Sequence, residues 1–118
     1  DIDGDGAGNG VQTNLQYAEI GTGGLIILSV LGFLYIASTG VIKSNGKKGG
    51  YANDGVPHTL AGGGSGGGSI NLLYGSLTNN GTINADGGAR QTTSAGGPVS
   101  YGGAGGAGSV RANSLKVT

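Results

Sequence analysis

The chain has 118 residues, of which 30 are glycine and two are proline; it has no cysteine, and its six basic residues balance six acidic ones. This length fits one domain or part of a larger array, and no disulfide framework can form. The balanced charge leaves no basic patch for nucleic acid, and the scarcity of proline together with the missing Gly-X-Y period excludes collagen.

The apolar residues are distributed unevenly along the chain. Tryptophan and methionine are absent and phenylalanine occurs once, so any core must consist of Leu, Ile, Val and Ala. The glycine content alone is also typical of a disordered, low-complexity chain. Because the apolar residues gather in short runs at spaced positions, we expect a packed fold instead. The sequence starts at Asp1, which indicates either a removed leader or a piece of something longer.

Residues 1–22 are predicted to form a polar loop followed by a first weak strand at residues 11–20, where apolar positions alternate. The loop has the spacing of a calcium-binding loop, with oxygen ligands at alternate residues and a glycine, Gly6, at the bend. The candidate ligands are Asp1, Asp3, Asp5 and Asn9, with Gln12 after them. The closing glutamate and flanking helices are missing, so an exposed polar loop is the alternative interpretation.

Residues 25–42 carry no charge and are followed by Lys43, Lys47 and Lys48. This length and these flanks also fit a membrane-spanning helix, as in a pilin-like or membrane subunit. We favour strands, because the segment is rich in β-branched residues and is interrupted by Gly32 and Gly40. It also aligns with a later segment that is too polar to cross a bilayer.

That alignment is part of a cassette that occurs twice and begins a third time. One copy reads Gly-Gly-Ser-Ile-Asn-Leu (67–72), then Leu77, then Gly-Thr-Ile-Asn-Ala-Asp-Gly-Gly (81–88). The earlier copy has Gly-Gly-Leu-Ile-Ile-Leu (23–28), then Ile36, then Gly40 to Gly46, and a third begins at 106–112. Ile26, Ile70 and Val110 are thereby aligned, at intervals of 44 (70 − 26) and 40 (110 − 70). Such spacing indicates stacked units, here about 23–66, 67–105 and 106–118.

Glycine-rich connections join these units, from Gly46 to Gly68 and from Gly87 to Gly108. Asn-Gly and Asp-Gly dipeptides, among them 45–46, 80–81 and 86–87, predict tight turns with positive φ. The expected fold is all-β, with short stacked strands and glycine-rich turns, either β-solenoid-like (β-helix-like) or a small β-sandwich. The segments 62–68 and 102–108 could instead contribute to a layer of polyglycine helices that bond laterally.

The sequence resembles the glycine-rich repeat domains of bacteriophage tail or virion appendage proteins and of bacterial cell-surface proteins. The residues that carry this resemblance are Gly-Gly-Gly-Ser-Gly-Gly-Gly-Ser-Ile-Asn-Leu (62–72), the asparagine-rich run at 77–88 and Gly-Gly-Ala-Gly-Gly-Ala-Gly-Ser-Val-Arg (102–111). The resemblance covers residues 23–118. It implies an extracellular, cell-surface or virion location and an elongated homo-oligomer, a trimer or filament, and it brings no catalytic residues with it.

Other candidate sites are few. Tyr51 and Tyr101 lie in glycine-rich loops, where an exposed ring could stack on a sugar of a host receptor. His58 is the only histidine and has no partner by spacing, and the Gly-x-Gly-x-x-Gly match at 103–108 is expected by chance in so much glycine. Calcium is the only cofactor that the residues suggest.

We therefore expect a non-enzymatic structural protein of an extracellular or virion assembly: a fibre, filament, tail appendage or capsid decoration. A single copy has little apolar surface to bury, so stability should come from burial between copies. The alternatives are an adhesin module that binds a host glycan or protein, and the membrane subunit with a helix at 25–42.

Overall fold

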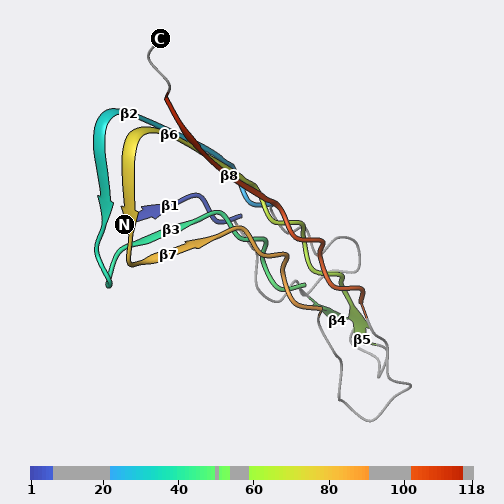
Figure 1. Cartoon of the computed structure of the whole chain (residues 1–118). Helices are drawn as coiled ribbons and strands as arrows, with labels where there is room; N and C mark the ends of the chain where they lie inside the picture. The colour runs from blue at the N-terminus through green and yellow to red at the C-terminus, as the bar shows by residue number, and fades with distance from the viewer. Residues whose placement is uncertain (7–21, 50, 54–58, 91–101, 116–118) are drawn as a thin grey trace.

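The computed structural model describes residues 1–6, 22–49, 51–53, 59–90 and 102–115. Within these ranges every regular element is a β-strand and there is no helix, which confirms the all-β prediction. The molecule is elongated, measuring 64 × 23 × 18 Å along its principal axes (Figure 1). The predicted strand at residues 11–20 lies outside the described residues.

Two parallel sheets and one small antiparallel pair make up the structure. The longer sheet has the order β2-β6-β8 and contains β2 (Leu25–Ile36), β6 (Ser69–Asn79) and β8 (Ser109–Ser114). The shorter sheet has the order β1-β3-β7 and contains β1 (Ile2–Asp3), β3 (Val41–Lys43) and β7 (Thr82–Asn84). The antiparallel pair is β4 (Tyr51–Asn53) with β5 (Thr59–Ala61). Residues 1–10 were expected to be a loop, yet this region begins with the short strand β1.

Residues 25–36 form a strand, so the helical alternative for 25–42 is wrong. The apolar residues of β2 do not need a membrane because alternate side chains face a core: Ile26, Leu28 and Val30 are half-buried, while Leu25 and Ile27 are exposed. A period of two is the pattern of a half-buried strand. In the part of the chain that the structure describes, no helix is long and apolar enough to span a bilayer.

The register of the longer sheet places Ile26 beside Ile70, and Ile70 beside Val110. These are the residues that the cassette spacing aligned. The register shifts between Val30 and Phe33, where Leu31 and Gly32 of β2 lie opposite Gly75 alone. Such a bulge bends the strand, and β2 and β6 bend together (Figure 1). Beyond the bulge Leu77 pairs with Leu34, so its sequence alignment with Ile36 is corrected.

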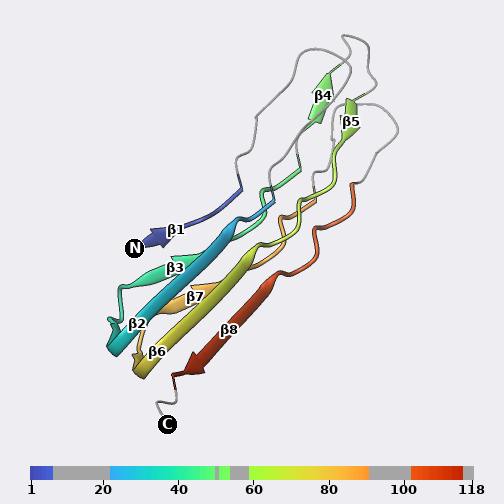
Figure 2. The same cartoon turned by 90° about the horizontal axis from the view of Figure 1, so that it is seen from above.

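The parallel pairings order the chain into four levels, seen side by side in Figure 2. The first level is β1, the second is β2 followed by β3, the third is β6 followed by β7, and the fourth is β8. A turn at residues 37–40 leads from β2 into β3, and a bend at Gly81 leads from β6 into β7. The second and third levels therefore contribute to both sheets, and the outer two contribute to one sheet each.

The core lies between the two sheets and is narrow. Its buried members come from the second and third levels: Ile36, Ile42, Ile70, Leu72 and Ala85, with Ile26, Leu28, Leu34, Tyr74, Leu77 and Ile83 packed against them. Among the described residues, Ile70 and Leu72, both from β6, are the only large apolar side chains with no exposure at all. The apolar interior is therefore one cluster centred on β6, with one neighbouring level on each side.

Extended glycine-rich segments continue from the sheets and form a layer of their own, which we call the glycine layer: residues 44–49, 62–68, 85–90 and 102–108. Its amides bond laterally at three-residue intervals. Gly64 and Gly67 donate to Gly103 and Gly106, Gly46 and Gly49 donate to Asp86 and Ala89, and Gly105 and Gly108 donate to Gly88 and Ala85, over 2.7–3.0 Å. An extended chain with three residues per turn makes no internal hydrogen bonds. The layer therefore satisfies its backbone through neighbouring segments.

At most positions of this layer, close approach of neighbouring backbones requires glycine. A Cβ built on Gly46 would lie 2.8 Å from the Gly88 nitrogen, and one on Gly67 would lie 2.7 Å from the Gly108 nitrogen, closer than real Cβ atoms come. The turns predicted at Asn45-Gly46 and Asp86-Gly87 are not confirmed: neither dipeptide forms a turn or bend, and neither glycine has positive φ. Of these three predicted turns, only Asn80-Gly81 lies at a bend, where the Gly81 amide donates a 3.0 Å hydrogen bond to Oδ1 of Asn79.

The two parallel sheets stay open. They do not close into a solenoid coil, and they differ from a sandwich of antiparallel strands, so neither finer version of the predicted fold is confirmed. The crossovers from one level to the next leave the sheets through the glycine layer (Figure 2).

Candidate interaction surfaces

Among the described residues, the outer strands of the two parallel sheets have no strand partner on one side. In the longer sheet, β2 and β8 are the outer strands; in the shorter sheet they are β1 and β7. An outer strand presents backbone N–H and C=O groups that can pair with another chain. Because β1 and β2 lie at one end of the level order and β7 and β8 at the other, each end of the stack presents two edges.

Columns of aligned apolar side chains reach both ends of the stack. Ile2, Ile42 and Ile83 are in register across the shorter sheet, and Ile26, Ile70 and Val110 are in register across the longer one. The middle members are buried, with Ile42 5% exposed and Ile70 fully covered. Ile2 ends its column on the β1 side of the stack and is 38% exposed, and Val110 ends its column on the β8 side and is 46% exposed. The apolar interior is thus uncovered at its ends.

The β1 end of the stack is also hollowed. A pocket there is lined by Asp1, Ile2, Leu28, Leu34, Tyr35, Ile36, Gly40, Val41 and Ile42. Its lining includes core side chains from β2 and β3. At this end the shorter sheet extends one level further than the longer sheet, which starts at β2. The pocket therefore lies beside the place where a further strand would continue the longer sheet.

The outer face of β2 carries exposed apolar side chains. Leu25, Ile27, Leu31, Phe33 and Tyr35 are all more than half exposed, and the rings of Phe33 and Tyr35 stack at a centroid distance of 6.3 Å. On β6 the residues paired with Leu25, Ile27, Phe33 and Tyr35 are Ser69, Asn71, Ser76 and Thr78. The apolar stripe therefore belongs to β2 and is replaced by polar residues one level further.

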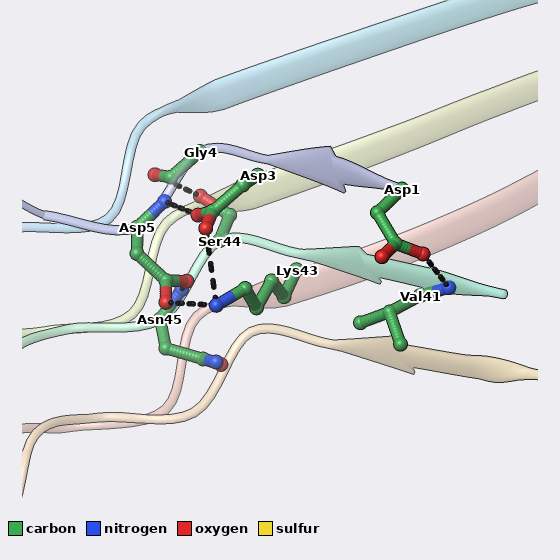
Figure 3. Close-up of polar contacts among 8 residues, drawn as sticks. All are labelled: Asp1, Asp3, Gly4, Asp5, Val41, Lys43, Ser44 and Asn45. Atoms are coloured by element: carbon green, nitrogen blue, oxygen red, sulfur yellow. Dashed lines mark hydrogen bonds and ion pairs between the residues drawn. The ribbon is translucent and has the colours of Figure 1, made fainter. Parts of the chain in front are cut away.

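A lysine links the first two levels (Figure 3). Nζ of Lys43 lies 3.1 Å from a carboxylate oxygen of Asp3 and 3.1 Å from one of Asp5. The Asp5 amide donates a hydrogen bond of 2.9 Å to Oδ1 of Asp3. That backbone hydrogen bond, followed by the Lys43 ammonium, lowers the pKa of Asp3 below its ordinary value of 3.8. The bonds to Asp3 and Asp5 raise the pKa of Lys43 above 10.5. The three charges therefore favour the docked position of β1.

A ladder of Asp and Asn side chains runs along the same edge of the stack. The Asn45 amide donates 2.6 Å to Oδ1 of Asp5, and the Asp86 amide donates 2.8 Å to Oδ1 of Asn45. Each side chain thus accepts a hydrogen bond from the backbone of the next level. Among the described residues, Asp86 is the last member of the ladder. Its carboxylate is therefore in position to accept a hydrogen bond from the backbone amide of a further level.

A second polar contact fixes the start of the glycine layer. Ser44 is fully buried, and its hydroxyl donates 2.6 Å to the Gly24 carbonyl, with the Gly4 carbonyl 3.2 Å away. Ser44 follows β3, whereas Gly4 and Gly24 belong to the first and second levels. One side chain therefore joins the two sheets at the point where the glycine layer begins.

The residues of the predicted calcium loop are partly described. The Asp1 carboxylate accepts a 3.0 Å hydrogen bond from the Val41 amide, and Asp3 and Asp5 bind Lys43 (Figure 3). Among the residues in the described ranges, no group of three or more His, Cys, Asp or Glu side chains could hold a metal ion. Asn9 and Gln12 lie outside these ranges. Calcium binding by the whole loop stays a prediction.

The predicted receptor contacts are also only partly described. The Tyr51 backbone pairs with Ala61 in the β4–β5 hairpin, whereas its side chain, His58 and Tyr101 lie outside the described residues. Sequence reasoning missed Lys43 and the ladder of Asp5, Asn45 and Asp86. Their spacings of 40 (45 − 5) and 41 (86 − 45) are close to the cassette interval and could have revealed the ladder.

We compared the chain with family models, with curated proteins and with solved structures, and none of the three comparisons gave a match.

Proposed function

We propose that this chain is a non-enzymatic structural protein that associates with itself and forms part of an extracellular, cell-surface or virion assembly. The observation that carries the proposal is the open stack: apolar columns that are buried in their middle levels and end in an exposed residue, Ile2 at one end of the stack and Val110 at the other. Repeat proteins that stay monomeric cover their terminal units with polar caps. Here the exposed ends and edges favour further association. The same proposal includes the division of the chain into repeats, at about 23–66, 67–105 and 106–118.

The glycine layer supports a mechanical role. Its hydrogen bonds join segments far apart in the sequence, and most of its glycines leave no room for a side chain between the backbones. Such a layer adds stiffness along the 64 Å length of the molecule without a large apolar core. The extracellular or virion location rests on the resemblance of residues 62–72, 77–88 and 102–111 to phage and cell-surface repeats.

The test is the state of the purified 118-residue chain in solution. Light scattering and sedimentation velocity across the micromolar range should show species larger than a monomer that grow with concentration, and electron microscopy should show elongated particles. A folded chain with a β-type circular dichroism spectrum that remains monomeric throughout this range would contradict the proposal.

A second candidate function, an adhesin module, is favoured by one observation. Phe33 and Tyr35 form an exposed aromatic pair on β2, and an aromatic face of this kind can stack on a sugar ring. Glycan-array binding that is lost in Phe33→Ala and Tyr35→Ala but kept in the neighbouring Ser29→Ala variant would support it. Equal binding by all these variants would reject it.

A further inference from the structure

We propose that copies of this chain stack head to tail, so that β8 of one copy and β1 of the next together complete one level. The partner is a second copy of this chain, and the contact is made by strand edges. This inference rests on the proposed self-association and specifies its geometry.

The two ends of the stack have stepped shapes that are complementary to each other. At one end β1 extends one level beyond β2, and at the other end β8 extends one level beyond β7. A second copy moved along the stacking axis by three levels would place its β1 beside β7 and its β2 beside β8. Both contacts repeat parallel pairings that the chain already makes, β1 with β3 and β2 with β6. Each edge then gains a strand of matching direction.

The apolar columns continue across this contact. Following the register, Ile2 of the next copy lies on Ile83, and Ile26 of the next copy lies on Val110. Ile2 and Val110 are the exposed ends of their columns, at 38% and 46%. β8 of the preceding copy also extends the longer sheet beside the pocket at the β1 end. Stacking therefore buries the ends of the apolar columns that one copy leaves uncovered, which favours association.

The polar ladder continues in the same register. Asp5 and Asn45 each accept a hydrogen bond from the backbone amide of the next level, and Asp86 holds the equivalent position in the third level. In the stack, the Asp86 carboxylate accepts a hydrogen bond from the Asp5 amide of the next copy. In the single chain that amide donates to Oδ1 of Asp3 in the same copy. The charges are compatible, because Asp3 and Asp5 of the next copy are already paired with its Lys43.

The contact joins two different surfaces and does not close on itself, so it produces a filament. Each copy advances the filament by three levels. At about 4.8 Å between paired strands, the rise per copy is about 14 Å. The long axis of each molecule lies across the filament axis, because strands run perpendicular to the direction in which they pair.

Cysteine cross-linking tests this geometry directly, because the chain has no cysteine of its own. Ser29 pairs with Leu73, and Leu73 with Asn113, so the stack places Asn113 beside Ser29 of the next copy. Both side chains are exposed on the outer face. Neighbouring parallel strands hold their Cα atoms within the range that a disulfide spans. A mixture of Ser29→Cys and Asn113→Cys should therefore form a disulfide-linked dimer under mild oxidation, and neither variant should do so alone.

Thr78→Cys is the matched control. Thr78 is equally an exposed outer-face residue, but it lies on the middle strand β6, so it should cross-link with neither partner. Cross-linking of Ser29→Cys with itself would show a two-fold contact through the β2 face and would overturn the inference. Assembly without any cross-link in the mixture would overturn this geometry and leave the proposed function standing. Absence of assembly altogether would overturn both.

A charge at the end of a column provides a second test that does not depend on oxidation. Val110→Asp should raise the concentration needed for assembly at least about tenfold, because stacking would bury an unpaired carboxylate. The side chain is partly exposed in the single chain, so the β-type circular dichroism spectrum should be unchanged. Thr78→Asp should assemble like the parent chain. Equal assembly of Val110→Asp and the parent would contradict the stacking of Val110 on Ile26.

Discussion

The Gly68 amide donates a 2.7 Å hydrogen bond to the Ser44 carbonyl, and the Ser44 hydroxyl lies where a side chain on Gly68 would have to go. This pair joins the third level to the second at the point where the sheets give way to the glycine layer. Neither residue can become larger without moving the other.

Substitution of glycine in this layer should have opposite effects at different positions. Gly68→Ala should lower the free energy of unfolding by about 2 kcal/mol or more, because its methyl group would overlap backbone atoms and the Ser44 hydroxyl. Gly106→Ala, where a Cβ meets open space, should be neutral or stabilise by up to about 1 kcal/mol. Denaturant unfolding at one low protein concentration measures both. Equal destabilisation by the two variants would contradict the close-approach explanation.

Ser44→Ala should cost about 1 kcal/mol. The Gly24 carbonyl would lose the Ser44 hydroxyl but keep the 2.9 Å hydrogen bond from the Ser69 amide, so the cost should be near that of one net hydrogen bond. Ser29→Ala, on the exposed face of β2, should change stability by less than about 0.5 kcal/mol. The same unfolding assay compares the two, and an unchanged midpoint in Ser44→Ala would argue against the role given to its hydroxyl.

Docking of β1 should depend on pH at both extremes. Asp3 has a folded-state pKa below its ordinary 3.8, so its contribution is present above that pH and is lost as the pH falls through the lower folded value. Lys43 has a folded-state pKa above 10.5, so its contribution is present below that pH and is lost as the pH rises through the higher folded value.

The Ile2 methyl resonances should report both transitions of β1. They should shift at the two pH extremes in the parent chain. In Lys43→Met, which lacks the ion pairs, the alkaline shift should disappear and the acid shift should become smaller, because the Asp5 amide still donates to Asp3. Lys48→Met, which removes an exposed lysine outside these pairs, serves as the control and should behave like the parent. Identical pH profiles for the parent and Lys43→Met would show that these charges do not hold β1.

The ladder predicts a local effect of Asn45→Ala. The Asp86 amide would lose its acceptor, so its hydrogen exchange should accelerate and stability should fall by about 1 kcal/mol. Asn113→Ala, at an exposed position in β8, should leave both quantities unchanged. Unaltered exchange of the Asp86 amide in Asn45→Ala would contradict the ladder.

The sequence predicted the strand pairing correctly where similar apolar residues lie side by side in neighbouring strands. Ile26, Ile70 and Val110 could be aligned from spacing because parallel strands place equivalent residues side by side, and the strand character of 25–36 followed from that alignment. The alignment of Ile36 with Leu77 was wrong, because its interval of 41 (77 − 36) is that of the shorter sheet, where Ile42 pairs with Ile83. Before the turn Ile36 pairs with Asn79, and the connection at 37–40 is longer than the one at 80–81, a difference that local sequence does not reveal.

The roles of the small and charged residues were harder to predict. Gly46 and Gly87 sit in dipeptides typical of turns, but what requires glycine there is the approach of a segment from another level, which local sequence does not show. Asp3 and Asp5 have the spacing of cation ligands, and the cation that they meet is Lys43, which a different strand of the sheet brings to them. Such long-range partners follow from the order of strands.

The glycine layer also has a thermal consequence. Its segments are packed backbone against backbone, so unfolding them hydrates mainly peptide groups, and hydration of polar surface lowers the heat capacity that apolar surface raises. The heat-capacity increment of unfolding should therefore fall below the usual value of about 12–15 cal/mol/K per residue. A small increment flattens the dependence of stability on temperature. We expect calorimetry to show a molecule that loses little stability between cold and warm surroundings.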